Sequence, residues 1–73
     1  MKKGVKVVNV EINGQSQLLN EGATLFDIIQ QFGIESKRMV VELNGHVVKR
    51  SLWDKQSLSD NDRIEILEFV GGG

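Results

Sequence analysis

The sequence contains no cysteine among its 73 residues. A disulfide framework, a thiolate metal site and a cysteine nucleophile are therefore excluded. Histidine occurs once, as His46, and one imidazole cannot supply the three or four protein ligands that a zinc site needs. Charge of one sign does not prevail either, because nine basic residues face ten acidic ones and the net charge is -1. The field that gathers nucleic-acid phosphates is missing, which favours a protein or a small molecule as the partner.

Long apolar runs are also absent. Met1-Lys2-Lys3 has the charge of a signal-peptide start, but Asn9 and Glu11 interrupt the valines that follow it. No stretch approaches the roughly 18 apolar residues of a membrane helix. We therefore expect a cytoplasmic protein that does not enter a membrane. The length predicts one small domain, which we place at residues 1–70, with a glycine tail at residues 71–73.

The first half of the chain predicts a hairpin and a helix. Residues 5–12 are rich in β-branched side chains that alternate with polar ones, which is typical of a strand. Asn13-Gly14 then predicts a two-residue type I′ turn into a second strand at residues 15–19. Thr24 is placed to accept a hydrogen bond from the Asp27 amide and so to begin a helix over residues 24–32. We expect its buried stripe to consist of Leu25, Ile28, Ile29 and Phe32.

The second half predicts further strands around another Asn-Gly turn. Residues 39–43 alternate as a strand, and Asn44-Gly45 turns the chain into the apolar pair Val47-Val48. Residues 49–59 lose this period and predict a loop or a short helical turn, anchored by Leu52, Trp53 and Leu58. A turn at residues 60–62 leads into a last strand at residues 63–70 with Ile64 and Ile66 in phase.

One helix with a single apolar stripe must bury that stripe against the strands. The economical arrangement is an α+β fold in which the helix lies across one face of a mixed four- or five-stranded sheet. This element order resembles the ubiquitin-like β-grasp. The resemblance implies that the first and last strands lie side by side in the centre of the sheet and pair in parallel.

The strongest functional feature is the ending, Gly71-Gly72-Gly73. Three glycines contribute no side chains, so we expect them to extend as a mobile tail rather than to pack. Such a tail can thread a narrow channel and present a terminal carboxylate, which is ionised at pH 7, to ATP inside a partner enzyme. A frayed terminus or a linker is the alternative. The glycines directly follow a predicted central strand, which favours a function for them.

The whole chain resembles the ThiS family of sulfur carriers for thiamine biosynthesis. The matching residues are Val8-Glu11-Ile12-Asn13-Gly14, Thr24-Leu25-Phe26-Asp27-Ile28-Ile29, Val41-Glu42-Leu43-Asn44-Gly45 with Val47-Val48, Arg50, Trp53, Leu58, the run Asp60-Asn61-Asp62-Arg63-Ile64-Glu65-Ile66, and the glycine tail. The resemblance implies a protein cosubstrate, not an enzyme, that binds no cofactor itself. An E1-like adenylyltransferase would use ATP to adenylate the terminal glycine, and a persulfide sulfur donor would convert it to a thiocarboxylate. Thiazole synthase would then take the sulfur.

Family members usually end in two glycines, whereas this chain has three. We assign the reactive carboxyl group to Gly73 and keep Gly72 as the alternative. Just before the tail, Leu67, Phe69 and Val70 extend the apolar character of the last strand to both of its faces. They predict either a strand that is buried on both sides or shifted in phase by a bulge, or an exposed patch on which the partners dock.

Other readings have less support. A molybdopterin-synthase small subunit and a ubiquitin-like modifier share the tail chemistry, and an S4-like RNA-binding module shares the residues around Asn44-Gly45. The S4-like alternative is disfavoured because acidic residues dilute the basic ones that would contact RNA. The weaker candidate site residues, which we interpret as turn, core or solvated residues, are His46, Trp53, Lys37-Arg38, Lys49-Arg50, Asp54, Asp60 and Asp62.

Overall fold

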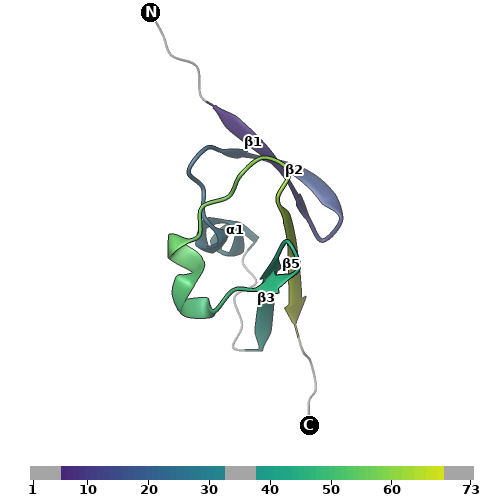
Figure 1. The fold of residues 1–73 in the computed structure, drawn as a ribbon, viewed down its shortest axis with the longest axis vertical. Coiled ribbons are helices and arrows are strands. Elements are labelled where there is room, and N and C mark those ends of the chain that lie inside the picture. The colour runs from purple at the N-terminus through teal and green to yellow at the C-terminus, as the bar shows by residue number, and fades with distance from the viewer. Residues whose placement is uncertain (1–5, 33–37, 69–73) are drawn as a thin grey trace, which may run out of the picture.

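The computed structural model describes residues 6–32 and 38–68 and has an α+β architecture (Figure 1). Its elements are β1 (Val7–Ile12), β2 (Gln15–Asn20), α1 (Leu25–Phe32), β3 (Met39–Leu43), β4 (His46–Val47), the 3₁₀ helix η1 (Arg50–Lys55) and β5 (Arg63–Glu68). The strands form one five-stranded sheet in the order β2-β1-β5-β3-β4. The predicted fold is confirmed, with five strands rather than four. No helix in the two described ranges has the length and apolar character to cross a membrane.

Both Asn-Gly pairs form the predicted turns. Asn13 and Gly14 have φ angles of 49° and 86°, and Asn44 and Gly45 have φ angles of 52° and 87°. Positive φ at both central residues is the mark of a type I′ turn, whose twist matches that of the strands it joins. The residues that flank each turn pair directly, so the turns set the register of β1 with β2 and of β3 with β4.

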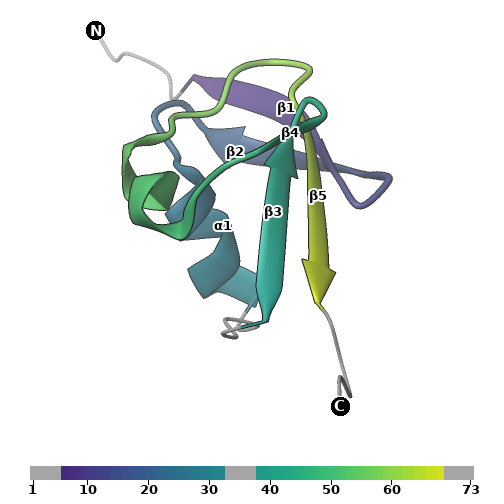
Figure 2. The same ribbon diagram turned by 60° about the horizontal axis from the view of Figure 1, so that its bottom comes forward.

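The centre of the sheet is formed by β1, β5 and β3. β1 and β5 run parallel, with Glu11 opposite Arg63 and Ile12 opposite Ile64. On its other side β5 pairs antiparallel with β3. The register covers the whole of β3, from Met39 opposite Glu68 to Leu43 opposite Ile64. Figure 2 shows β3 and β5 side by side, with α1 packed across one face of the sheet. The predicted parallel contact between the first and last strands is confirmed.

The start of α1 is closed by two reciprocal hydrogen bonds. The Asp27 amide donates to Thr24 Oγ1 over 3.2 Å, as the sequence predicts. The Thr24 amide in turn donates to Asp27 Oδ2 over 2.9 Å. This is the capping-box arrangement with aspartate in place of glutamate, and it satisfies two backbone donors that the helix leaves without partners.

Replacing Thr24 by alanine should lower the free energy of unfolding by about 1 kcal/mol, because the cap loses its acceptor oxygen. In a domain of this size that loss corresponds to a fall in Tm of about 4–8 °C. Thermal unfolding followed by circular dichroism measures it. Thr24→Ser keeps the oxygen and serves as the control, so equal Tm values for the two variants would contradict the capping role.

The core lies between α1 and the sheet. Leu25, Ile28 and Ile29 of α1 are almost fully buried. They belong to one cluster with side chains from the sheet and from the segment after β4, namely Val10, Ile12, Leu19, Met39, Val41, Trp53, Leu58, Ile64 and Ile66. Alternate residues of β1 and β5 therefore face the helix, as their sequence period predicts.

Two predicted core positions are wrong. Phe32 lies two helical turns after Leu25 and so on the same face of α1, but it is the last residue of the helix and is 38% exposed. Leu52 is 47% exposed, whereas its neighbour Trp53 is 2% exposed. Both lie in η1, and a 3₁₀ helix has three residues per turn, so adjacent side chains diverge and only one can face the core.

Candidate functional site

The candidate site is the C-terminal segment and the strand that leads into it. That strand, β5, is central, with β1 on one side and β3 on the other. Its inward side chains Ile64 and Ile66 are buried, and Leu67, which alternates with them, is 42% exposed. Leu67 therefore lies on the sheet face away from α1, opposite Val40 of β3. The other predicted residues of the segment, Phe69, Val70 and Gly71-Gly72-Gly73, lie outside the described residues.

The two Asn-Gly turns contact β5 through their asparagine side chains, a role that the sequence analysis missed. Asn13 Oδ1 accepts a hydrogen bond from the Ile66 amide over 2.7 Å. Asn44 Oδ1 accepts one from the Arg63 amide over 2.9 Å. Positive φ alone would permit glycine or aspartate at these positions. The occurrence of asparagine at both was the signal that could have pointed to an amide with a second task.

The turn before β5 is held by its acidic residues. Asp60 Oδ1 accepts a hydrogen bond from the Asn9 amide, and Asp62 Oδ2 accepts one from the Ser59 amide, each over 2.7 Å. The Asp62 Oδ1 atom also accepts from Asn44 Nδ2 over 3.0 Å. These carboxylates therefore organise the entry to β5. In the part of the chain that the structure describes, no group of three or more His, Asp or Glu side chains is placed to hold a metal ion.

The remaining candidates are spread over the molecule. His46 is exposed in β4 rather than in the turn itself. Trp53 is buried and its Nε1 donates to the Val48 carbonyl over 3.0 Å, and the Arg50 guanidinium lies 4.6 Å from the centre of its ring. Asp54 is exposed and lies 3.8 Å from the Lys55 ammonium group. The structure thus confirms Trp53 as a core residue.

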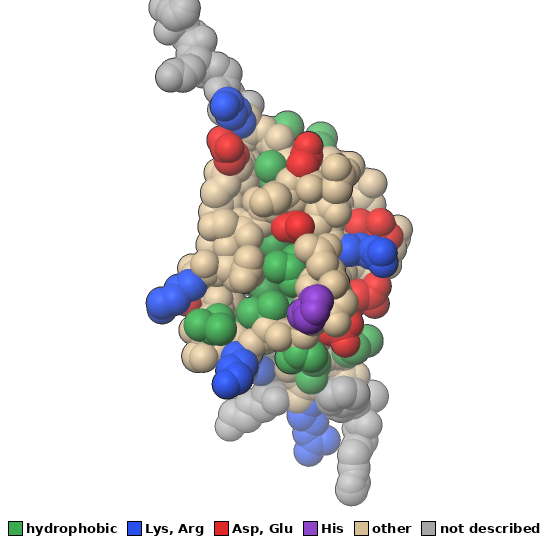
Figure 3. Space-filling view, in the orientation of Figure 1, with side chains coloured by type: hydrophobic (Ala, Val, Ile, Leu, Met, Phe, Trp, Pro, Cys, Tyr) green, Lys and Arg blue, Asp and Glu red, His purple; other side chains and the backbone are tan. Residues whose placement is uncertain are grey.

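On the face seen in Figure 3, the described basic side chains do not form a continuous surface. Arg38, Lys49 and Arg50 are exposed, whereas Lys37 lies outside the described residues. On the face seen in Figure 3, Lys and Arg side chains lie apart from one another and acidic side chains lie among them. This face therefore does not provide the clustered positive charge that nucleic-acid binding requires.

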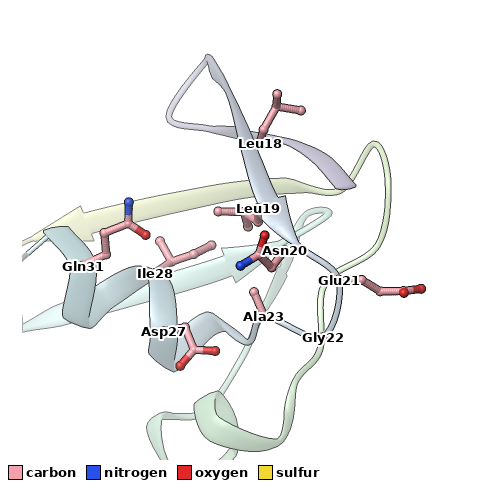
Figure 4. A pocket seen from close by; sticks show the side chains of 9 residues that line it. All are labelled: Leu18, Leu19, Asn20, Glu21, Gly22, Ala23, Asp27, Ile28 and Gln31. Carbon is pink, nitrogen blue, oxygen red and sulfur yellow. The ribbon is translucent and has the colours of Figure 1, made fainter. Parts of the chain in front are cut away.

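A hollow of about 490 Å³ lies between β2 and α1 (Figure 4). It is lined by Leu18, Leu19, Asn20, Glu21, Gly22, Ala23, Asp27, Ile28 and Gln31. Its Asp27 carboxylate already caps α1, and the Glu21 side chain points away from the other labelled side chains. These lining residues include no pair of a nucleophile and a base, so the hollow has no arrangement for catalysis.

Comparison with known proteins gives a consistent result over the whole chain. The model of the ThiS family matches residues 5–73. The crystal structure of a thiamine biosynthesis protein (ThiS) from Geobacter metallireducens superimposes with a TM-score of 0.77 at 29% identity, over 90% of this chain and 100% of that one. The sulfur carrier protein ThiS of Bacillus subtilis is 31% identical over 88% of this chain and 98% of its own length.

Two further relatives do not bear the name of a sulfur carrier. The uncharacterized protein ycf40 of Trieres chinensis is 37% identical over 85% of both chains. A thiazole synthase of Paramagnetospirillum magneticum is 31% identical over 85% of this chain, but the match covers only 19% of the synthase. This chain therefore corresponds to about a fifth of that longer polypeptide.

Proposed function

The chain belongs to the ThiS family, and from that premise we propose that it is a sulfur carrier for thiamine biosynthesis, a protein cosubstrate rather than an enzyme. The observation that carries the proposal is that the family match runs through residue 73 and so includes Gly71-Gly72-Gly73. The similarity to the Bacillus subtilis sulfur carrier over almost the full length of both chains supports it.

The proposed reaction begins at the terminal carboxylate, which we assign to Gly73 with Gly72 as the alternative. Inside an E1-like adenylyltransferase, a carboxylate oxygen attacks the α-phosphorus of ATP and pyrophosphate leaves. The product is an acyl adenylate, in which AMP is the leaving group for the next step. A glycine tail suits this step because it lacks Cβ atoms that would obstruct a narrow channel. ATP is bound by the partner, and this chain holds no cofactor of its own.

Sulfur then replaces AMP. The terminal sulfur of a persulfide attacks the carbonyl carbon, AMP departs, and the carrier is left joined to the donor through a sulfur–sulfur bond. A thiol cleaves that bond by attacking the donor's sulfur, which releases the carrier as a thiocarboxylate and leaves a disulfide. Because the chain has no cysteine, the sulfur is carried on the backbone terminus alone.

Thiazole synthase is the proposed acceptor. Support comes from the thiazole synthases of Paramagnetospirillum magneticum and Magnetococcus marinus, in which the matching region makes up 19% and 20% of the polypeptide. A carrier-like segment within the same chain as a synthase is expected if the two act together. We further propose that the partners dock on Leu67, Phe69 and Val70. Of these, Leu67 lies exposed on the sheet face away from α1.

The proposal is tested by incubating the chain with ATP, an E1-like adenylyltransferase of the ThiS pathway and a persulfide donor, followed by intact-mass spectrometry. We expect one oxygen to be replaced by sulfur, and fragmentation should place the change on the terminal glycine. Omission of ATP is the control. An unchanged mass in the complete mixture would contradict the proposal, as would sulfur at any other position.

The pathway is tested separately with two acceptors. The thiocarboxylate form should co-elute with thiazole synthase and should lose its sulfur to it. Co-elution with the large subunit of molybdopterin synthase instead would overturn the assignment to thiamine while leaving the carrier chemistry intact.

A further inference from the structure

The end of β1 makes an unusual contact with β5. In a parallel pair, every second residue of one strand bonds to the other strand. Its amide donates to the carbonyl of one residue there, and its carbonyl accepts from the amide two positions further along. The Glu11 amide donates to the Asp62 carbonyl and the Asn13 amide donates to the Ile64 carbonyl, each over 2.9 Å. The next bond of this series would join the Asn13 carbonyl to the Ile66 amide. Asn13 has a φ of 49°, however, and its backbone enters the turn.

The Asn13 side chain supplies the missing bond. Its Oδ1 accepts from the Ile66 amide over 2.7 Å, and its Nδ2 donates to the Ile66 carbonyl over 3.4 Å. A carboxamide has the same donor and acceptor groups as a peptide unit. It therefore extends the parallel ladder by one residue after the backbone of β1 has turned away.

The backbone of Ile66 depends on this side chain. The Asn44 amide donates to the Arg63 carbonyl over 2.8 Å, and hydrogen-bonded residues alternate in an antiparallel pair. Residues 63, 65 and 67 of β5 therefore bond toward β3, and the backbone groups of Ile66 face β1. Beyond Ile66, the register of β5 continues with β3 only, where Leu67 pairs with Val40 and Glu68 with Met39. Within the described residues, Ile66 is the last point at which β5 is held from both sides.

We propose that Asn13 is a positioning residue for the C-terminal tail, which it aims by fixing Ile66. This inference rests on the proposed function, because aim matters only if a partner must receive the terminus. Gly73 lies seven positions beyond Ile66 in the sequence, a contour of at most about 25 Å. Fixing Ile66 therefore fixes the point from which the end of the chain must reach a partner. A partner that binds a loosened strand must order it, and this cost appears as weaker binding.

Asn44 provides a matched control within the same chain. It has the same turn type, a φ of 52° and the same bond from its Oδ1 to a β5 amide. Its partner, Arg63, lies at the start of β5, where β1 and β3 hold the strand on both sides. Loss of the Asn44 side chain should affect folding without affecting the aim of the tail.

The test compares Asn13→Gly with Asn44→Gly, since glycine accepts positive φ and preserves both turns. Pyrophosphate release by the E1-like adenylyltransferase is measured against carrier concentration. For Asn13→Gly we expect KM to rise about fivefold to tenfold, the effect of losing two hydrogen bonds that order the strand. We expect kcat to stay within about twofold, because the bound geometry is unchanged. For Asn44→Gly both constants should stay within about twofold of the wild type.

A third variant, Asn13→Asp, keeps the oxygen that accepts from the Ile66 amide. Its KM should lie clearly below that of Asn13→Gly. The inference is overturned if Asn13→Asp and Asn13→Gly have the same KM, if Asn44→Gly raises KM as much as Asn13→Gly, or if Asn13→Gly lowers kcat with KM unchanged.

Hydrogen exchange of the free carrier separates this inference from the proposed function. The Ile66 amide should exchange about tenfold faster in Asn13→Gly than in the wild type, while the Ile64 amide should change less than the Ile66 amide. Unchanged exchange at Ile66 would refute the anchor without reference to any partner. Failure of the wild-type carrier to be adenylated would refute the proposed function, and the exchange result would still decide whether Asn13 fixes Ile66.

Discussion

Deletion of Gly72 and Gly73 is expected to reduce sulfur loading by at least about 100-fold, because displacement of a reacting group by even about 1 Å can cost that much. The shortened chain still ends in a glycine carboxylate, that of Gly71. That carboxylate falls short of the former terminus by up to about 7 Å when the chain is extended. The readout is the fraction of carrier that exchanges oxygen for sulfur with the adenylyltransferase, ATP and the persulfide donor.

The matched control removes two residues from the other terminus, Met1 and Lys2. Loading of this variant should equal that of the wild type. Both truncated chains should unfold at the wild-type Tm, since neither loses a side chain of the core cluster in the described residues. Wild-type loading of the chain without Gly72 and Gly73 would show that the tail is not the site of sulfur attachment.

Trp53→Ala is expected to lower the free energy of unfolding by about 3–5 kcal/mol, the usual cost of removing a buried tryptophan. The indole is 2% exposed, belongs to the main core cluster and donates to the Val48 carbonyl. At about 0.05–0.15 kcal/mol per residue, the stability of the whole domain is only about 4–11 kcal/mol. The variant should therefore lose a large part of its cooperative folding. Urea unfolding followed by far-ultraviolet circular dichroism measures the change.

Leu52→Ala is the control, since it truncates the adjacent apolar side chain of η1. Leu52 is 47% exposed, so the free energy of unfolding should fall by less than about 1 kcal/mol. Equal losses for the two variants would contradict the assignment of Trp53 alone to the core.

The fold was predictable from the sequence where local chemistry dictates conformation. Asn13-Gly14 and Asn44-Gly45 predict type I′ turns because few residues accept positive φ, and Thr24 predicts the start of α1 because its hydroxyl can cap it. Strand order does not follow from such patterns. It depends on contacts between distant segments, such as Ile12 with Ile64, and here it came from the resemblance to the β-grasp.

The burial of individual side chains was less predictable, because the direction of a side chain does not determine how deeply it is buried. The period of the sequence gives the direction of a side chain, so Leu25, Ile28 and Ile29 were placed correctly. It does not give the depth of burial, so it also predicts burial for Phe32, which lies at the end of α1 and is exposed. In η1 the residues have no period long enough to separate Leu52 from Trp53 before the 3₁₀ geometry is known.

For the candidate site, the sequence indicated the glycine tail but not the contact that holds the strand before it. Gly71-Gly72-Gly73 stands out because three glycines contribute nothing to a core. The contact between Asn13 and Ile66 joins residues 53 positions apart, and only the parallel register of β1 and β5 brings them together. Asparagine at this turn could indicate a second task for its amide, but it does not indicate which distant residue the amide contacts.

The central place of β5 has a consequence for synthesis of the protein. The hairpin and α1 leave the ribosome before β5 does, but β1 cannot join β3 without the strand between them. The nascent chain therefore exposes its apolar surface until residues 63–68 emerge, and long-range pairing of this kind slows folding. An activating enzyme that recognises the assembled sheet would thereby ignore incomplete translation products and engage only carriers whose synthesis has passed β5.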